Sequence, residues 1–309
     1  MVEVARRTGR LEGAMTALVT PFRGEEVDFE TLEGLVREQL EAGIGWLVPC
    51  GTTGESPTLS ESEHDEIVAR VVGFCGGRAR VMAGTGSNCT ATCVARTRRA
   101  AEAGAHAALL VVPYYNRPHA EGLFRHFATV AEAVELPLVL YNVPFRTGVQ
   151  LSNDVVVRLV EAYAGRIVGL KHATGSVDGV TDLLGRCEID VLSGDDVLTW
   201  PLMALGARGV ISVVSNVAPR LVHSLVTFAL ADDVRQARRL HRQVYDLAEG
   251  LGRYGPNPVP IKTALAITGR IEESFRLPLC PLGPEPRAAI EQLLRRHELL
   301  ARAPAAGTT

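Results

Sequence analysis

The sequence predicts an α/β protein, a (β/α)8 TIM barrel with a C-terminal helical extension. Short apolar runs alternate with stretches of helical spacing, a pattern typical of parallel strands covered by helices. The alternation repeats eight times within about 220 residues, which favours a closed barrel over an open sheet. Beyond about residue 232 only helical patterns remain.

The predicted strands are mostly apolar and are bounded by turn residues. The first strand ends near Pro21, which lacks a backbone N–H donor. We predict strands over residues 14–22, 45–50, 80–85, 107–113, 137–143, 167–171, 190–193 and 208–214.

The predicted helices follow the strands in order. Apolar residues recur at helical spacing from Phe29 to Leu40, and Gly43 then provides a stop signal. Similar spacing predicts barrel helices over residues 29–42, 60–74, 90–103, 120–134, 153–163, 176–185, 197–205 and 219–231. Three more helices are predicted over residues 232–250, 258–269 and 285–302, separated by breaks such as Gly255-Pro256-Asn257-Pro258.

These elements predict two domains. Residues 13–231 form the barrel that carries the active site, and residues 232–302 form a helical domain. Residues 1–12 are typical of a loose arm, and residues 303–309 are expected to be a disordered tail.

Composition excludes several classes of function. A net charge of −3 and a pI near 6.3 give no basic surface for nucleic acid or an anionic membrane. No apolar run predicts a signal peptide or a spanning helix. The six cysteines form no CxxC pair, which favours a reducing cytoplasm, and the histidines show no HxH or HExxH spacing. We therefore expect no metal.

Lys171 is the first candidate for catalysis. The chain has only two lysines, Lys171 and Lys262, and Lys171 ends the apolar run that begins at Ile167. Burial disfavours the ammonium form, and a neutral amine can attack a carbonyl to form a Schiff base. A strand-end lysine paired with a carboxylate is the alternative.

Other polar residues follow the predicted strands at their carboxyl ends, where TIM barrels place their active sites. The turn Gly51-Thr52-Thr53-Gly54 offers N–H groups and hydroxyls to a carboxylate. Phosphate is a less suitable ligand, because Asp195 and Asp196 follow the seventh strand and would repel a dianion where many barrels bind one. Tyrosine hydroxyls could transfer protons to and from an imine, and Arg146 could bind a second carboxylate.

Five motifs, in order and spacing, resemble the dihydrodipicolinate synthase / N-acetylneuraminate lyase family over roughly residues 13–300. They are Gly51-Thr52-Thr53-Gly54-Glu55, Pro113-Tyr114-Tyr115-Asn116-Arg117-Pro118, Tyr141-Asn142-Val143-Pro144-Phe145-Arg146-Thr147-Gly148, Gly169-Leu170-Lys171 and Leu192-Ser193-Gly194-Asp195-Asp196.

The resemblance implies a class I aldolase-type barrel in which Lys171 forms an imine with pyruvate, without another cofactor. Thr52 and Thr53 would hold the pyruvate carboxylate, and Thr53, Tyr115 and Tyr141 would form a proton relay. Tyr115 would reach in from a neighbouring subunit, which implies a homotetramer built as a dimer of dimers. Gly194 and the carbonyl of Ile211 would also lie at the substrate site.

Within the family, the Thr52-Thr53 pair and Arg146 resemble the synthases rather than the neuraminate lyases. This implies condensation of pyruvate with L-aspartate 4-semialdehyde in lysine and diaminopimelate biosynthesis. Two departures concern the aldehyde. His172 stands where an acidic residue is usual and is expected to alter the field near the imine, while Phe145 replaces a small residue and is expected to reshape the aldehyde pocket.

A lysine effector site is partly matched. Ser56, His64, Asn88 and Tyr114 fit it, whereas Pro57, Glu61 and Thr92 differ from strongly inhibited members. Thr92 replaces a glutamate that would pair with the effector's ammonium, so we predict weak or absent inhibition by lysine.

Three alternatives stay open at this stage. The first is a lyase or dehydratase of the same family that acts on N-acetylneuraminate or a 2-keto-3-deoxy sugar acid. The second is a pyridoxal-phosphate enzyme, which the acidic Asp195-Asp196 loop disfavours, and the third is a barrel retained as a ligand sensor. A sensor would be expected to lack some of the four candidate catalytic residues, which are all present.

Overall fold

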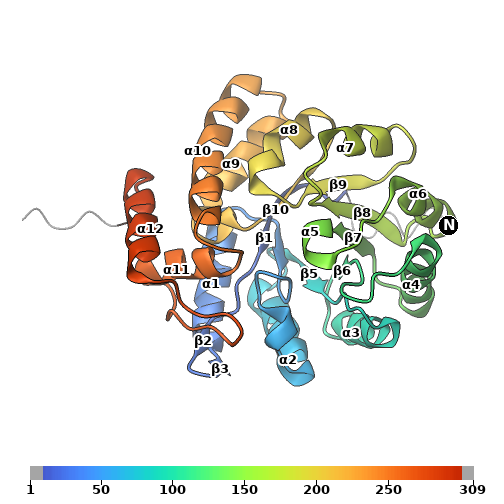
Figure 1. Cartoon of the computed structure of the whole chain (residues 1–309), viewed down its shortest axis with the longest axis horizontal. Helices are drawn as coiled ribbons and strands as arrows, with labels where there is room; N and C mark the ends of the chain where they lie inside the picture. The colour runs from blue at the N-terminus through green and yellow to red at the C-terminus, as the bar shows by residue number, and fades with distance from the viewer. Residues whose placement is uncertain (1–9, 301–309) are drawn as a thin grey trace, which may run out of the picture.

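The computed structural model describes residues 10–300, and eight parallel strands form a closed barrel in it (Figure 1). Their order around the barrel is β1-β10-β9-β8-β7-β6-β5-β4. The strands are β1 (Gly13–Ala17), β4 (Trp46–Val48), β5 (Arg80–Gly84), β6 (Ala107–Val111), β7 (Leu138–Asn142), β8 (Ile167–His172), β9 (Asp190–Ser193) and β10 (Gly209–Ser212). The predicted (β/α)8 barrel is confirmed.

Helices follow each strand and cover the outside of the barrel (Figure 1). Several begin at side-chain caps, such as the reciprocal capping box of Ser60 and Glu63. The covering helices are α1 (Phe29–Glu41), α2 (Glu61–Cys75), α3 (Thr90–Glu102), α4 (Ala120–Ala133), α6 (Asn153–Ala162), α7 (Val177–Leu184), α8 (Thr199–Ala204) and α9 (Pro219–Leu230). Each lies where helical spacing predicted it.

The structure adds short elements that the sequence patterns did not indicate. They are the hairpin β2 (Phe22–Arg23) and β3 (Glu26–Val27), the helix α5 (Pro144–Thr147) and the 3-10 turns η1 (Ser56–Thr58), η2 (Asp196–Leu198) and η3 (Val214–Asn216). None is long enough for a periodic apolar pattern, which is the signal that predicts an element. Most of them lie in the loops that build the site.

Three further helices, α10 (Val234–Gly252), α11 (Val259–Ile267) and α12 (Pro284–Arg296), lie together along one side of the barrel (Figure 1). Helix α10 packs against α8 and α9, and α12 packs against α10 and α11. Helix α12 ends at Arg296, earlier than predicted, and Glu298 has a left-handed φ of 55°. The predicted tail over 303–309 lies outside the described residues.

Two apolar layers hold the fold. One lies between strands and helices, and the other fills the barrel with side chains such as Met15, Trp46, Met82 and Ile211. Leu11 belongs to this inner layer at 1% exposure, and its N–H donates to Asp190 at 2.9 Å. The predicted loose arm is therefore wrong at its end, because Leu11 packs into the barrel; residues 1–9 lie outside the described part.

Candidate active site

Lys171 lies near the carboxyl end of β8, and its side chain is only 6% exposed. Its Nζ lies 4.1 Å from the ring centroid of Tyr141, which is its register partner on β7. The predicted buried lysine is thus found beside one of the predicted relay tyrosines. No ion pair to Lys171 occurs among residues 10–300, in contrast to the alternative of a lysine paired with a carboxylate.

Gly194 lets the loop after β9 approach this lysine closely. Its N–H donates to the carbonyl of His172 at 2.7 Å. A Cβ at position 194 would lie 2.7 Å from the Cβ of Ala173 and 3.2 Å from Cε of Lys171. A larger residue would therefore press on the lysine side chain.

The turn after β4 presents the predicted threonines. Gly54 and Ser56 both donate to the carbonyl of Gly51, and Glu55 adopts a left-handed φ of 55°. Thr52 lines a cavity at the barrel mouth, whereas Thr53 is buried. The Thr53 hydroxyl accepts a hydrogen bond from Nδ2 of Asn257 at 2.9 Å.

The cavity at the barrel mouth has a volume of about 340 Å³. Thr52 reaches it from the end of β4, and Tyr141 and Arg146 reach it from β7 and the short helix α5 that follows. The Tyr141 residue that Lys171 contacts forms part of its wall. Its lining is Cys50, Gly51, Thr52, Ser56, Pro57, Gly84, Gly86, Ser87, Arg96, Leu109, Val111, Tyr114, Tyr141, Val143, Arg146 and Thr147. An apolar wall with a few convergent polar groups suits a small ligand.

Arg146 lies on the short helix α5 at the rim of this cavity. Its guanidinium donates to the backbone carbonyl of Asn257 at 3.0 Å and lies 5.4 Å from the ring centroid of Phe145. Phe145 is 73% exposed and does not line the cavity. The Phe145 ring contacts Arg146 from outside the cavity, and the expectation that Phe145 reshapes the aldehyde pocket stays a prediction.

Tyr115 does not reach the cavity of its own chain. Its side chain is 89% exposed, its φ is 71°, and its backbone N–H donates to the carbonyl of Thr147. No hydrogen bond within residues 10–300 joins Thr53 to Tyr115 or Tyr141. The complete relay is therefore not assembled by one chain, as the prediction of a neighbour's tyrosine requires.

His172 points away from Lys171, because successive side chains of a strand face opposite sides. Its Nε2 lies 2.8 Å from the carbonyl of Ser176 and 2.9 Å from the hydroxyl of Thr174. Burial lowers the pKa of His172, while the bond to Ser176 opposes that shift. The expectation that His172 sets the field at the imine is not supported by this orientation.

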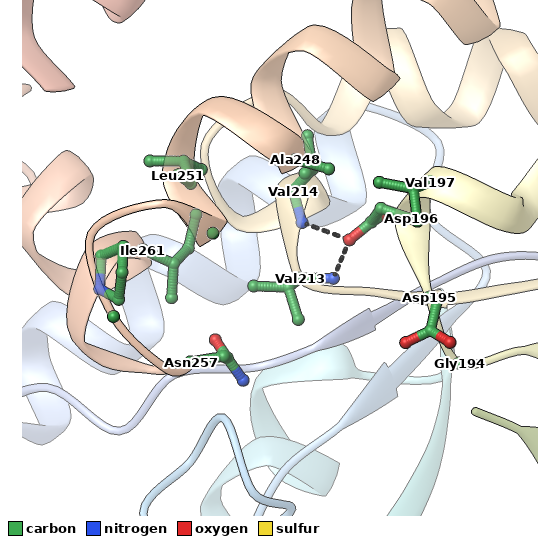
Figure 2. Close-up of a pocket in the computed structure, with 13 residues that line it drawn as sticks. Gly194, Asp195, Asp196, Val197, Val213, Val214, Ala248, Leu251, Asn257 and Ile261 are labelled. Atoms are coloured by element: carbon green, nitrogen blue, oxygen red, sulfur yellow. Dashed lines mark hydrogen bonds between the residues drawn. The ribbon is translucent and has the colours of Figure 1, made fainter. Parts of the chain in front are cut away.

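The two aspartates after β9 take different positions (Figure 2). Asp196 accepts from Ser212 and from the N–H groups of Val213 and Val214. Burial raises the pKa of both carboxyls, and the charge of Lys171 opposes this for Asp195. Asp195 and Asn257 face a second cavity of about 190 Å³, between the β9 loop and the α10–α11 connection.

The predicted effector residues separate in the structure. Ser56 and Tyr114 line the cavity at the barrel mouth, and the carbonyl of Asn88 accepts a hydrogen bond from Asn116 at 2.8 Å. His64 is buried outside the cavity lining, with Nε2 2.8 Å from the carbonyl of Gly84, and burial lowers its pKa. Arg96, which the sequence reasoning missed, lines this region and pairs with Glu61.

Residues 10–297 match the model of the Dihydrodipicolinate synthetase family. The chain belongs to this family. A curated 4-hydroxy-tetrahydrodipicolinate synthase of Pelobacter propionicus is 46% identical over 94% of this chain and 99% of that protein. The solved dihydrodipicolinate synthase of Aquifex aeolicus superposes with a TM-score of 0.92 at 43% identity, covering 95% of this chain and all of that one.

A further solved relative is the chloride-inhibited dihydrodipicolinate synthase of Acinetobacter baumannii, complexed with pyruvate. It is 43% identical, with a TM-score of 0.90 over 94% of this chain and 100% of that one. The family predicted from the five motifs is confirmed, and so is an enzymatic function of the synthase type.

Asn257 and Lys262 are the main contacts that the sequence reasoning did not assign. Asn257 bonds Thr53 and Arg146 from the α10–α11 connection, a position that only looked like a helix break. Lys262, on α11, pairs with Glu55 of the threonine turn, and both side chains have 0% exposure. Contacts across such sequence distances leave no local pattern.

Two absences hold for the described part of the chain. Between residues 10 and 300 no group of three or more His, Cys, Asp or Glu side chains is placed to hold a metal ion. No helix in this range combines the length and apolar character needed to cross a membrane.

Proposed function

We propose that this chain is a 4-hydroxy-tetrahydrodipicolinate synthase, a class I aldolase-type lyase that condenses pyruvate with L-aspartate 4-semialdehyde in lysine and diaminopimelate biosynthesis. The observation that carries the proposal is the buried amine of Lys171 against the Tyr141 ring, at the strand ends that also hold Thr52 and Arg146. The names of the relatives support the same reaction, and one of them was crystallised with pyruvate.

Lys171 provides the covalent chemistry. Its amine, after losing a proton, attacks C2 of pyruvate, the carbinolamine loses water, and an imine forms between Nζ and C2. Loss of a proton from C3 then gives an enamine, whose C3 attacks the aldehyde carbon while the aldehyde oxygen takes up a proton and becomes a hydroxyl. The amine of the semialdehyde then attacks C2, closes the ring and releases the amine of Lys171. We propose that this imine takes the place of a metal or organic cofactor.

The threonine turn and the tyrosines would bind the pyruvate imine and transfer protons to and from it. Thr52 at the cavity and the N–H groups of its turn would hold the pyruvate carboxylate, while Gly194 leaves room beside Lys171. Tyr141, with Thr53, would transfer protons as the carbinolamine and enamine form. The carbonyl of Ile211 beside the lysine stays a prediction.

Arg146 would bind the carboxylate of the aldehyde substrate. It lies at the cavity rim, and a guanidinium can contact a carboxylate through two parallel N–H groups. Its bond to the Asn257 carbonyl and its stacking on Phe145 hold it in place before substrate arrives. This preorganisation supports a substrate with a carboxylate at its far end.

We further propose a cytoplasmic homotetramer in which Tyr115 completes the relay of a neighbouring copy. The tyrosine projects from its own chain, and large exposed aromatic side chains are enriched at protein interfaces. Sedimentation should show an assembly of at least two chains. Tyr115→Phe should lower kcat without dissociating this assembly. A fully active monomer would contradict this assignment.

The first test follows pyruvate consumption with L-aspartate 4-semialdehyde for wild type, Lys171→Arg and Arg146→Ala. We expect turnover in wild type, none in Lys171→Arg, and a strongly raised KM for the aldehyde in Arg146→Ala. Borohydride should trap pyruvate on Lys171. Trapping without turnover would instead indicate another aldehyde, such as N-acetylmannosamine or a sugar-derived aldehyde, and absence of both would overturn the enzymatic proposal.

A further inference from the structure

We propose that Asn257 is a positioning residue that fixes the direction of the proton relay at Thr53 and holds Arg146 through a separate atom. The inference rests on the proposed function, because it concerns the relay and the carboxylate binder of that reaction. Asn257 lies in the connection between α10 and α11, outside all strand-end motifs.

The first step of the argument is the polarity of one hydrogen bond. Nδ2 of Asn257 donates to the Thr53 hydroxyl at 2.9 Å. A hydroxyl has one donor and two acceptor positions, so an incoming N–H leaves the Thr53 proton available for another oxygen. Because Thr53 is buried, bulk water does not compete freely for that proton. The amide therefore selects the rotamer in which Thr53 donates into the site.

The second step is the orientation of Asn257 itself. Its backbone carbonyl accepts from Arg146 at 3.0 Å, and prolines on both sides, Pro256 and Pro258, restrict the local backbone. Its buried Oδ1 has no hydrogen-bond partner among residues 10–300. The bond from Nδ2 to Thr53 is thus the polar contact that the side chain makes within this part of the chain.

The two contacts use different atoms, and this makes the proposal testable. Asn257→Asp keeps the shape of the side chain and the backbone carbonyl but replaces the donor with an acceptor. Thr53 would then donate its proton to the carboxylate and lose it from the relay. We expect kcat to fall about 100-fold, the scale of a general acid–base contribution, with KM for the aldehyde within about threefold of wild type.

A pH profile gives the distinguishing signature. Below roughly pH 4 the new carboxyl of Asn257→Asp becomes protonated and can donate again, so its kcat relative to wild type should rise as the pH falls. Asn257→Ala, which has no titrating group, should show a smaller loss, about 10-fold, with no such recovery. Gln236→Glu, an amide-to-acid change on α10, is the charge-matched control and should leave the profile unchanged.

The outcomes separate this inference from the proposed function. Borohydride trapping and turnover by wild type test the latter alone. With an active wild type, an unchanged kcat in Asn257→Asp overturns the inference, as does an equal loss in Asn257→Asp and Asn257→Ala without recovery at low pH. If Asn257→Asp does not fold, Asn257→Ala decides: a lowered kcat at unchanged KM supports the positioning role, and wild-type kcat overturns it.

Discussion

Replacing Lys262 with Met should cost more stability than any exposed charge change, because the lysine forms a fully buried ion pair. Lys262 and Glu55 have 0% side-chain exposure, and the ammonium lies 4.4 Å and 5.0 Å from the ring centroids of Phe22 and Phe275. Burial lowers the pKa of Lys262, and the Glu55 carboxylate opposes that shift. Each of the two buried charges is therefore stable in the core only while its partner is present.

The magnitude follows from what the substitution leaves behind. Met fills most of the lysine volume, so the main effect is a buried Glu55 carboxylate that keeps one N–H, from Arg276 at 3.3 Å. Breaking a buried pair in this way costs about 3–5 kcal/mol. For a chain of this size that corresponds to a fall in Tm of roughly 5–8 °C.

Thermal and urea unfolding of Lys262→Met, Glu55→Gln and the double variant would measure this cost. We expect the double variant to be more stable than Lys262→Met, because no uncompensated charge remains. Arg37→Met is the matched control, since Arg37 and Glu33 form an exposed pair worth less than about 1 kcal/mol. Equal losses in Lys262→Met and Arg37→Met would refute the reasoning.

Three further predictions concern other parts of the chain. Leu11→Ala should lower the free energy of unfolding by about 3 kcal/mol in urea titrations. Leu230→Ala, at a partly exposed position, is the control and should lower it by less than about 1 kcal/mol. Equal small losses would show that Leu11 does not pack the barrel. Burial lowers the pKa of His126 to about 4, so as the pH falls the unfolded chain binds a proton at this histidine before the folded chain does. The free energy of unfolding should therefore fall by up to about 3 kcal/mol between about pH 6.5 and pH 4. His126→Asn should flatten that part of the stability–pH curve, and an unchanged curve would contradict the assignment. Lysine should inhibit weakly or not at all; tight, saturable binding with inhibition, measured by titration calorimetry and kinetics, would disprove this.

The sequence predicted the barrel well because each strand is a compact apolar run between turn residues. Lys171 stood out because a lone lysine ended such a run, and the structure confirms its burial. The orientation of His172 follows from the sequence, since side chains alternate along a strand and His172 comes directly after Lys171. The packing of Leu11 cannot be predicted in this way, because a single apolar residue has no period.

Other features could not have been predicted from local patterns. Helix α5 spans four residues, too few for a helical period, yet it places Arg146 at the cavity. The bond between Asn257 and Thr53 joins residues that are 204 positions apart, and neither belongs to a pattern that refers to the other. Such contacts depend on how the α10–α11 connection crosses the barrel mouth.

The C-terminal helices restrict how this enzyme could be recombined with its relatives. Asn257 and Lys262, both beyond the last barrel strand, contact the turn that carries Thr53 and Glu55. A chimaera that joins this barrel to the C-terminal helices of a relative would keep Lys171 in place. Its threonine turn, however, would lose the contacts that Asn257 and Lys262 make in this chain. Exchange of that segment should succeed only when the donor and recipient agree at these positions, or when the turn is transplanted with it.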